Sequence, residues 1–132
     1  MKKVVVIGGG AAGLMAATVA GEKGLKVTLI ERNERPARKV MITGKGRCNL
    51  TNNCDNQTFI NNVPVNGRFL YSAINNFSTA DVMDFFEGLG LELKTERGNR
   101  VFPVSDKATD VVDALVRRAK RAGVRLQQAR VT

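Results

Sequence analysis

The chain has 132 residues, a formal net charge of +9, 43% hydrophobic residues and 25% charged residues. This composition is that of an ordinary soluble protein about one domain long. The chain contains no histidine, which rules out histidine-based metal sites and Ser-His or Cys-His nucleophile pairs within these residues. We therefore predict no metal site.

The first part of the chain predicts a strand, a glycine-rich loop, a helix and a second strand. The predicted elements are a strand over 3–7, a helix over 11–23 and a strand over 26–30. Three glycines spaced Gly-x-Gly-x-x-Gly join the first strand to the helix, and Glu31 ends the second strand. This order of elements, with the acid about 20 residues after the loop, is typical of a dinucleotide-binding βαβ unit.

Each glycine of the loop has a separate task in such a unit. Gly8 allows a sharp turn off the strand, Gly10 leaves room for a pyrophosphate, and Gly13 lets the helix lie close to the sheet. The free amides at the helix start, at Ala11 and Ala12, would then face the phosphates together with the positive end of the helix dipole.

Glu31 predicts which kind of dinucleotide binds. At the carboxyl end of the second strand, its carboxylate is placed to accept hydrogen bonds from ribose hydroxyls, and its charge would repel a 2′-phosphate. The pattern therefore favours an adenosine with a free ribose, as in FAD or NAD.

The basic start and the apolar run that follows also resemble a signal peptide. Glycines crowd the middle of that run, however, and no convincing cleavage point follows it, so we expect a cytoplasmic protein with free thiols at Cys48 and Cys54. The run is also too short and too rich in glycine for a membrane span, and we expect no membrane partner.

The rest of the chain predicts one long polar loop followed by helices and strands. Residues 32–67 lack a sustained period, and long ordered loops are commonly functional. After it we expect a helix over 68–76, a helix capped by Ser78 or Thr79, a hairpin of strands 91–95 and 100–102, a helix over 106–122 capped by Ser105, and a strand over 124–131.

This order predicts an α/β, Rossmann-like, doubly wound dinucleotide-binding fold. It would have a parallel sheet with helices on both faces and a small β-hairpin insertion. The strands are too few for a complete fold, so we expect residues 1–132 to be the N-terminal part of an FAD/NAD(P)-binding domain, with the remainder of the polypeptide to follow.

The basic residues of the last predicted helix invite a nucleic-acid interpretation. Arg117, Arg118, Lys120 and Arg121 lie on the outer side and in the last turn of that helix, where water and the helix dipole suit cations. Interleaved aromatic residues, typical of single-strand binders, are missing there, so we expect no nucleic-acid partner.

The long loop contains a second glycine-rich, basic segment, residues 39–52. Gly44 and Gly46 permit close approach of a ligand, and Lys39, Lys45 and Arg47 supply donors. It is not a Walker loop, because Gly46 rather than Ser or Thr follows the lysine. Such a loop could cover a pyrophosphate from the side opposite the first loop.

These two segments resemble a known family. The opening matches the extended FAD fingerprint of two-dinucleotide flavoproteins. Residues 43–52, Thr-Gly-Lys-Gly-Arg-Cys-Asn-Leu-Thr-Asn, resemble the GxGRCNxTN signature of BaiN-type, or YhiN-like, NAD(P)/FAD-dependent oxidoreductases, which include aminoacetone oxidase. The resemblance implies that this is the FAD-binding segment of a flavin-dependent oxidoreductase, with hydride or electron transfer between FAD and an unknown small-molecule substrate or NAD(P)H.

The resemblance also implies where the cofactor lies. Glu31 would hold the adenosine ribose, the loop from Thr43 to Asn49 would run along the pyrophosphate, ribityl chain and flavin edge, and Val131 would approach the adenine. The candidate cofactor-binding residues are Gly8, Gly10, Ala11, Ala12, Gly13, Glu31, Arg32, Arg38, Lys39, Thr43, Gly44, Gly46, Arg47, Cys48, Asn49 and Val131.

Two alternatives stay open. The segment could be a truncated, non-catalytic FAD- or NAD-binding module, and no catalytic residue can be named from the sequence. Cys48 and Cys54 could also form a redox-active pair beside the flavin, although their Cys-x5-Cys spacing differs from the Cys-x4-Cys of disulfide reductases.

Overall fold

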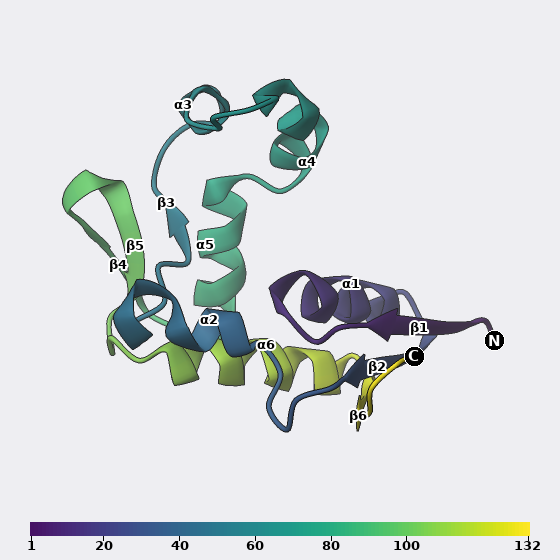
Figure 1. Ribbon diagram of the computed structural model, residues 1–132. Coiled ribbons are helices and arrows are strands. Elements are labelled where there is room, and N and C mark those ends of the chain that lie inside the picture. Colours follow the sequence, from purple (N-terminus) through teal and green to yellow (C-terminus); the bar gives the residue numbers. More distant parts are fainter.

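The computed structural model describes residues 1–132 and contains two small sheets joined by helices (Figure 1). The strands are β1 (Lys3–Ile7), β2 (Lys26–Glu31), β3 (Thr51–Asn52), β4 (Leu93–Glu96), β5 (Arg100–Pro103) and β6 (Arg125–Gln128). The α-helices are α1 (Ala11–Glu22), α2 (Arg38–Ile42), α3 (Asn56–Asn61), α4 (Tyr71–Asn76), α5 (Thr79–Gly88) and α6 (Ala108–Arg121). Short 3₁₀ turns are η1 (Thr43–Gly46), η2 (Gly67–Leu70) and η3 (Arg97–Asn99).

The first sheet is parallel and has the strand order β1-β2-β6. In its register Val4 pairs with Val27, and Leu29 pairs with Leu126. The chain crosses from β1 to β2 through α1, and returns to the sheet at β6 only after α6. The predicted α/β, Rossmann-like fold with a parallel sheet is therefore confirmed.

The second sheet is antiparallel and has the order β3-β5-β4. Strands β4 and β5 form the predicted hairpin, which turns through η3. The two residues of β3 pair with the start of β5, so this sheet ties the region after β2 to the hairpin.

Helices α1 and α6 lie on the same face of the parallel sheet. Val27 and Leu29 are buried in one core with Leu14 of α1 and Ala119 of α6. On the opposite face, side chains such as Ile7, which is 67% exposed, are uncovered. The expectation of helices on both faces is thus wrong for these residues. Both crossovers move along the sheet in the same direction, and right-handed crossovers then place their helices on the same face.

The predicted helix caps had different outcomes. Ser78 caps α5, since its hydroxyl accepts from the amide of Asp81 at 3.1 Å and the Asp81 carboxylate accepts from the amide of Ser78 at 2.9 Å. Ser105 does not cap α6, because that helix begins two residues later than expected, after Lys107. Its hydroxyl instead accepts from the amide of Lys107 at 3.3 Å.

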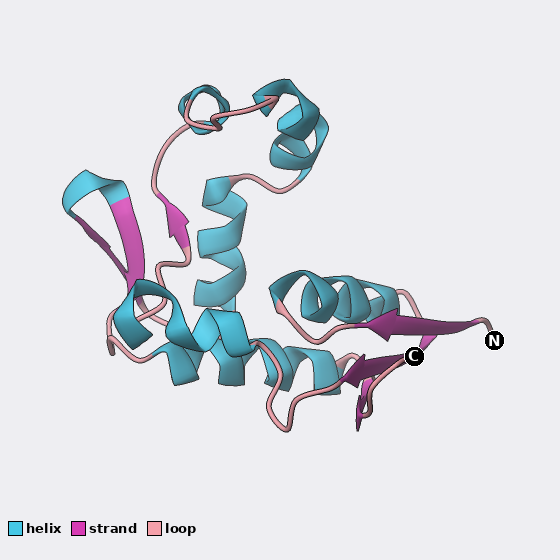
Figure 2. Cartoon of the chain, viewed as in Figure 1, coloured by secondary structure: helices cyan, strands magenta, loops and turns pink.

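Residues 32–67 are not a structureless loop (Figure 2). They contain α2, η1, β3 and α3, each six residues long or shorter. Such pieces are too short to show a helical or strand period in the sequence. Asp55 caps α3 by accepting from the amide of Thr58 at 2.7 Å. None of the helices combines the length and apolar content that a membrane crossing needs.

Candidate cofactor-binding site

A cavity of about 690 Å³ opens at the start of α1, where the glycine loop leaves β1. Its walls come from the glycine loop, the α2–η1 region and the apolar sides of α5 and α6. The predicted site residues that line it are Gly8, Gly10, Ala11, Ala12, Gly13, Lys39, Thr43, Cys48 and Asn49. The fold thus brings the two glycine-containing segments, which are about 30 residues apart in sequence, to one cavity.

The geometry of the first loop requires glycine at two positions. Gly8 has a φ of +99°, and its amide donates to the carbonyl of Ile30 at 2.8 Å. A Cβ on Gly13 would lie 1.8 Å from the carbonyl oxygen of Gly8. The predicted turn at Gly8 and the close helix packing at Gly13 are therefore both present.

At Gly10, by contrast, neither the backbone conformation nor the packing requires a glycine. Its φ is −77°, which any residue adopts, and a Cβ placed on it would meet nothing within 4 Å. It is the N-cap of α1, and this helix start has no side-chain cap. The amides of Ala11 and Ala12 are thus left facing an open space, which suits a phosphate.

A second cavity, of about 330 Å³, lies at the carboxyl ends of β2 and β6. Its lining includes Glu31, Arg32 and Val131 from the predicted set, and it shares Ile7 and Gly8 with the first cavity. An extended ligand with one end in each cavity would therefore pass over the glycine loop, as the predicted course of FAD requires.

Glu31 holds its carboxylate against the glycine loop. One oxygen accepts from the amide of Gly9 at 3.2 Å, and the other accepts from the amide and the side chain of Asn33 at 3.0 and 3.1 Å. The hydrogen bond from the Asn33 amide is the main cause of a lowered pKa, with a further contribution from Gly9. The group is therefore an anion at neutral pH. A carboxylate has about four acceptor sites, so room remains for a ribose hydroxyl.

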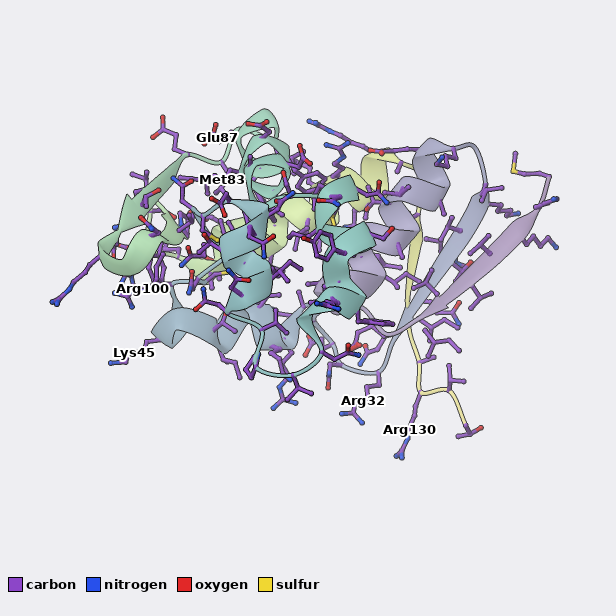
Figure 3. The ribbon with its side chains drawn as sticks, turned by 90° about the horizontal axis from the view of Figure 1, so that it is seen from above. Arg32, Lys45, Met83, Glu87, Arg100 and Arg130 are labelled. Carbon is purple, nitrogen blue, oxygen red and sulfur yellow. The ribbon has the colours of Figure 1, made fainter.

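Arg130 also lines the second cavity and was missed from the sequence. Figure 3 shows the side chains of Arg32 and Arg130 extending from the same side of the molecule. Arg130 is the second residue after β6, next to Ala129, whose amide donates to the carbonyl of Glu31 at 2.9 Å. Its place in the sequence, at the end of a strand neighbouring β2, was a usable signal.

Four predicted residues line neither cavity: Arg38, Gly44, Gly46 and Arg47. The side chain of Arg47 turns to the hairpin instead of the cavity. Its guanidinium bonds to the carboxylates of Glu96 and Asp106 and lies 3.9 Å from the centre of the Phe102 ring. The structure thus gives this side chain a protein partner, and its contact with the cofactor stays a prediction.

Packing requires a glycine at position 44. Gly44 has a φ of +57°, and a Cβ on it would lie 2.9 Å from the Asn49 amide nitrogen and 3.1 Å from the Phe102 ring. Gly46 has a φ of +83° with open space around it. Neighbouring Lys45 extends away from the molecule (Figure 3). The second glycine segment is therefore shaped by its own turn and by the hairpin.

The two thiols are free and lie in different surroundings. Cys48 is buried and lines the first cavity, and burial raises its pKa. Cys54 lines a separate cavity with Thr58 and Phe59. This arrangement gives no support to a redox-active pair beside the cofactor.

One wall of the first cavity is apolar. Phe77, Phe85 and Phe86 stack edge to face, with ring centres 6.3 Å apart for Phe77 and Phe85 and 5.1 Å apart for Phe85 and Phe86. All three line the cavity, together with Val82. They make one side of the cavity apolar, and helical spacing alone does not distinguish a core residue from one that lines a cavity.

A larger open cleft, of about 860 Å³, lies between the segment after β2 and α6. Arg35, Arg117, Lys120 and Arg121 line it, whereas none of the predicted cofactor-binding residues does. No glycine lines this cleft, so the two cavities beside the glycine loop are the candidate nucleotide site.

Comparison with known proteins identifies relatives of this chain. The family described as the HI0933-like protein Rossmann domain matches residues 2–132. A 3-dehydro-bile acid delta(4,6)-reductase of Clostridium scindens is 33% identical over 129 residues, covering 96% of this chain and 31% of that protein. A ribosomal RNA dihydrouridine synthase of Escherichia coli is 31% identical over 121 residues, covering 91% of this chain and 29% of that protein. The chain thus spans about a third of the length of these relatives.

Solved structures show the same fold at low identity. THI4 of Thermovibrio ammonificans superposes with a TM-score of 0.62 at 13% identity, covering 96% of this chain and 38% of that one. L-proline dehydrogenase of P. horikoshii gives 0.59 at 14% identity, covering 96% of this chain and 44% of that one. The Rossmann architecture is thereby confirmed independently of sequence.

Proposed function

Because the chain belongs to the HI0933-like Rossmann domain family, we propose that it is the FAD-binding segment of a flavin-dependent oxidoreductase. The observation that carries this proposal is Gly10. Neither backbone conformation nor packing requires a glycine there, and the absent side chain leaves an opening in front of an uncapped helix start. That is the space a pyrophosphate needs.

The two cavities divide the cofactor between them. Glu31, Arg32 and Val131 would surround the adenosine, and the amides of Ala11 and Ala12 would hold the pyrophosphate. The remaining part would extend between the segment that carries Lys39, Thr43, Cys48 and Asn49 and the phenylalanine wall. Apolar side chains on one side and donors on the other suit a planar ring with a polar edge.

The names of the two curated relatives suggest a reaction class. Both describe the reduction of a carbon–carbon double bond, and in a 3-dehydro-Δ4 steroid and in uracil that bond is conjugated with a carbonyl group. FAD held by these residues would supply the hydride chemistry for reducing such a bond, and NAD(P)H would return the two electrons. We therefore propose a conjugated carbonyl compound as the substrate and NAD(P)H as the donor.

A non-catalytic nucleotide-binding module is the alternative, since the chain spans about a third of its relatives. Reconstitution separates the two proposals. The purified protein is titrated with FAD and with NAD⁺ while flavin fluorescence and absorbance are followed. A yellow complex whose 450 nm band is bleached by NAD(P)H under anaerobic conditions supports the oxidoreductase, and FAD binding without bleaching supports the module.

The substrate class is tested with the same reduced complex. A 3-oxo-Δ4 steroid and a uridine-containing RNA are added separately, and flavin reoxidation is followed in the absence of oxygen. Reoxidation by either compound with formation of the saturated product supports the reaction class, and reoxidation by neither contradicts it. The RNA arm also tests the expectation that no nucleic acid binds.

A further inference from the structure

The segment that forms one wall of the candidate cofactor cavity has an unfavourable backbone. Four of its residues have positive φ values: Gly44 at +57°, Lys45 at +58°, Gly46 at +83° and Cys48 at +62°. Lys45 and Cys48 have side chains, for which this left-handed region is disfavoured. Such a conformation persists only where surrounding contacts hold it.

Bonds within the segment are few. The amide of Arg47 donates to the carbonyl of Gly44 at 3.2 Å, and that of Cys48 donates to Thr43 at 3.0 Å. Both bonds close local turns and would survive if the whole segment moved as a unit. The amide of Leu50 donates to the carbonyl of Val101 at 2.9 Å, so the end of the segment is fixed to β5, whereas its middle needs a further connection to the rest of the protein.

The side chain of Arg47 supplies that connection. Its Nε donates to Asp106 at 2.9 Å, its Nη2 bonds to Glu96, and its plane lies on the ring of Phe102. Lys94 joins the same two carboxylates, at 3.1 Å from Glu96 and 2.9 Å from Asp106. A planar guanidinium with separate donors can satisfy two acids and a ring at once, which an ammonium group cannot.

We propose that Arg47 is a positioning residue, which locks the Thr43–Asn49 wall of the cofactor cavity onto the β4–β5 hairpin without touching the cofactor. The consequence for affinity rests on the proposed FAD-binding function, whereas the lock itself does not. Thr43, Cys48 and Asn49, on either side of this anchor, line the cavity. Releasing Arg47 would therefore let the wall leave its binding position.

The test uses Arg47→Met and Arg47→Lys, with Arg100→Met as the matched control. Arg100 lies 5.7 Å from the same Phe102 ring, but it pairs with no carboxylate and bonds only to the carbonyl of Arg97. Two readouts are taken: the dissociation constant for FAD, and the rate at which a lysine-specific protease cuts after exposed Lys45 in the cofactor-free protein.

We expect Arg47→Met to weaken FAD binding about tenfold and to speed cleavage after Lys45 by a similar factor, since partly exposed ion pairs and one stacked cation are lost. Arg47→Lys should recover part of both effects, and Arg100→Met should change neither. Circular dichroism and thermal unfolding of each variant show whether the fold is kept. If Arg47→Met unfolds the protein, Glu96→Gln combined with Asp106→Asn removes the same partners and takes its place.

Three outcomes overturn the proposal. Weaker FAD binding without faster cleavage would mean that Arg47 contacts the cofactor directly. Unchanged binding with faster cleavage would mean that the lock has no effect on the site, and unchanged cleavage would mean that the lock does not exist. If the unaltered protein binds no FAD, the proposed function fails, and the cleavage rates still decide whether Arg47 holds the segment.

Discussion

The carboxylate of Glu31 accepts a hydrogen bond from the amide of Gly9 at 3.2 Å, which joins the end of β2 to the middle of the glycine loop. The two residues also pack closely, because a Cβ placed on Gly9 would lie 3.0 Å from the Cβ of Glu31. The acid is thus held in place before any ligand arrives. The carboxylate can accept hydrogen bonds from the loop amide and from a ribose hydroxyl at the same time, so it connects the two cavities.

Replacing Glu31 tests this coupling. We expect Glu31→Gln to lower FAD affinity by about tenfold or more, because a hydrogen bond to a charged group contributes about 1.5–3 kcal/mol. Isothermal titration with FAD measures the effect. Glu34→Gln is the matched control, because Glu34 is exposed and lines neither cavity. Equal affinities for the two variants would contradict the role of Glu31.

Two glycine substitutions should separate binding from folding. Gly10→Ala meets no atoms and no φ restriction, so it should lower stability by at most about 1 kcal/mol, the difference between glycine and alanine at an N-cap. Its methyl group should nevertheless weaken FAD binding. Gly13→Ala would press against the Gly8 carbonyl and should destabilise the fold by about 1–3 kcal/mol or more.

Denaturant unfolding and FAD titration of both variants measure these effects. A Gly10→Ala protein that binds FAD as tightly as the original would show that the opening at the helix start is not the phosphate site. The pair is informative because the two residues lie in the same loop, three positions apart.

The first βαβ unit could be predicted from the sequence because everything that shapes it is local. Its glycines, its helix and Glu31 lie within one continuous segment, and each has its expected place. Arg47 could not be placed in this way. Its partners Glu96 and Asp106 are 49 and 59 residues away, so a basic residue beside two glycines was indistinguishable from a ligand donor.

The prediction of helices on both faces of the sheet failed for a similar reason. A helix period shows which side of a helix is apolar, but it does not show which face of the sheet that helix reaches. Only the strand order β1-β2-β6 decides that α1 and α6 share one face. The exposed Ile7 on the other face follows from topology rather than from pattern.

The thiols should be slow to react at neutral pH. Burial raises the pKa of Cys48, and burial together with the nearby charge of Asp55 raises the pKa of Cys54, so the reactive thiolate is scarce in both. We expect alkylation to reach Cys54 first, because Cys48 is only 4% exposed. Timed alkylation with mass spectrometry measures the order. A Cys48–Cys54 bridge after mild oxidation would revive the redox-pair hypothesis.

The ion pairs around Arg47 predict a pH dependence. Hydrogen bonds from Arg47 and Lys94 lower the pKa of Glu96 below its ordinary value of 4.5, and those from Lys94 and Arg47 lower the pKa of Asp106 below its ordinary value of 3.8. Groups with a depressed folded pKa bind more protons when unfolded, so their contribution to stability is fully present above about pH 4.5 and is lost as the pH falls through their folded values.

Cleavage after Lys45 should therefore accelerate in acid before global unfolding. An acid-tolerant lysine-specific protease measures the cleavage, and circular dichroism measures the unfolding. In the Glu96→Gln, Asp106→Asn protein the early acceleration should be missing, because cleavage is already fast at neutral pH. If the original protein shows no acceleration until it unfolds, the carboxylates do not hold the segment.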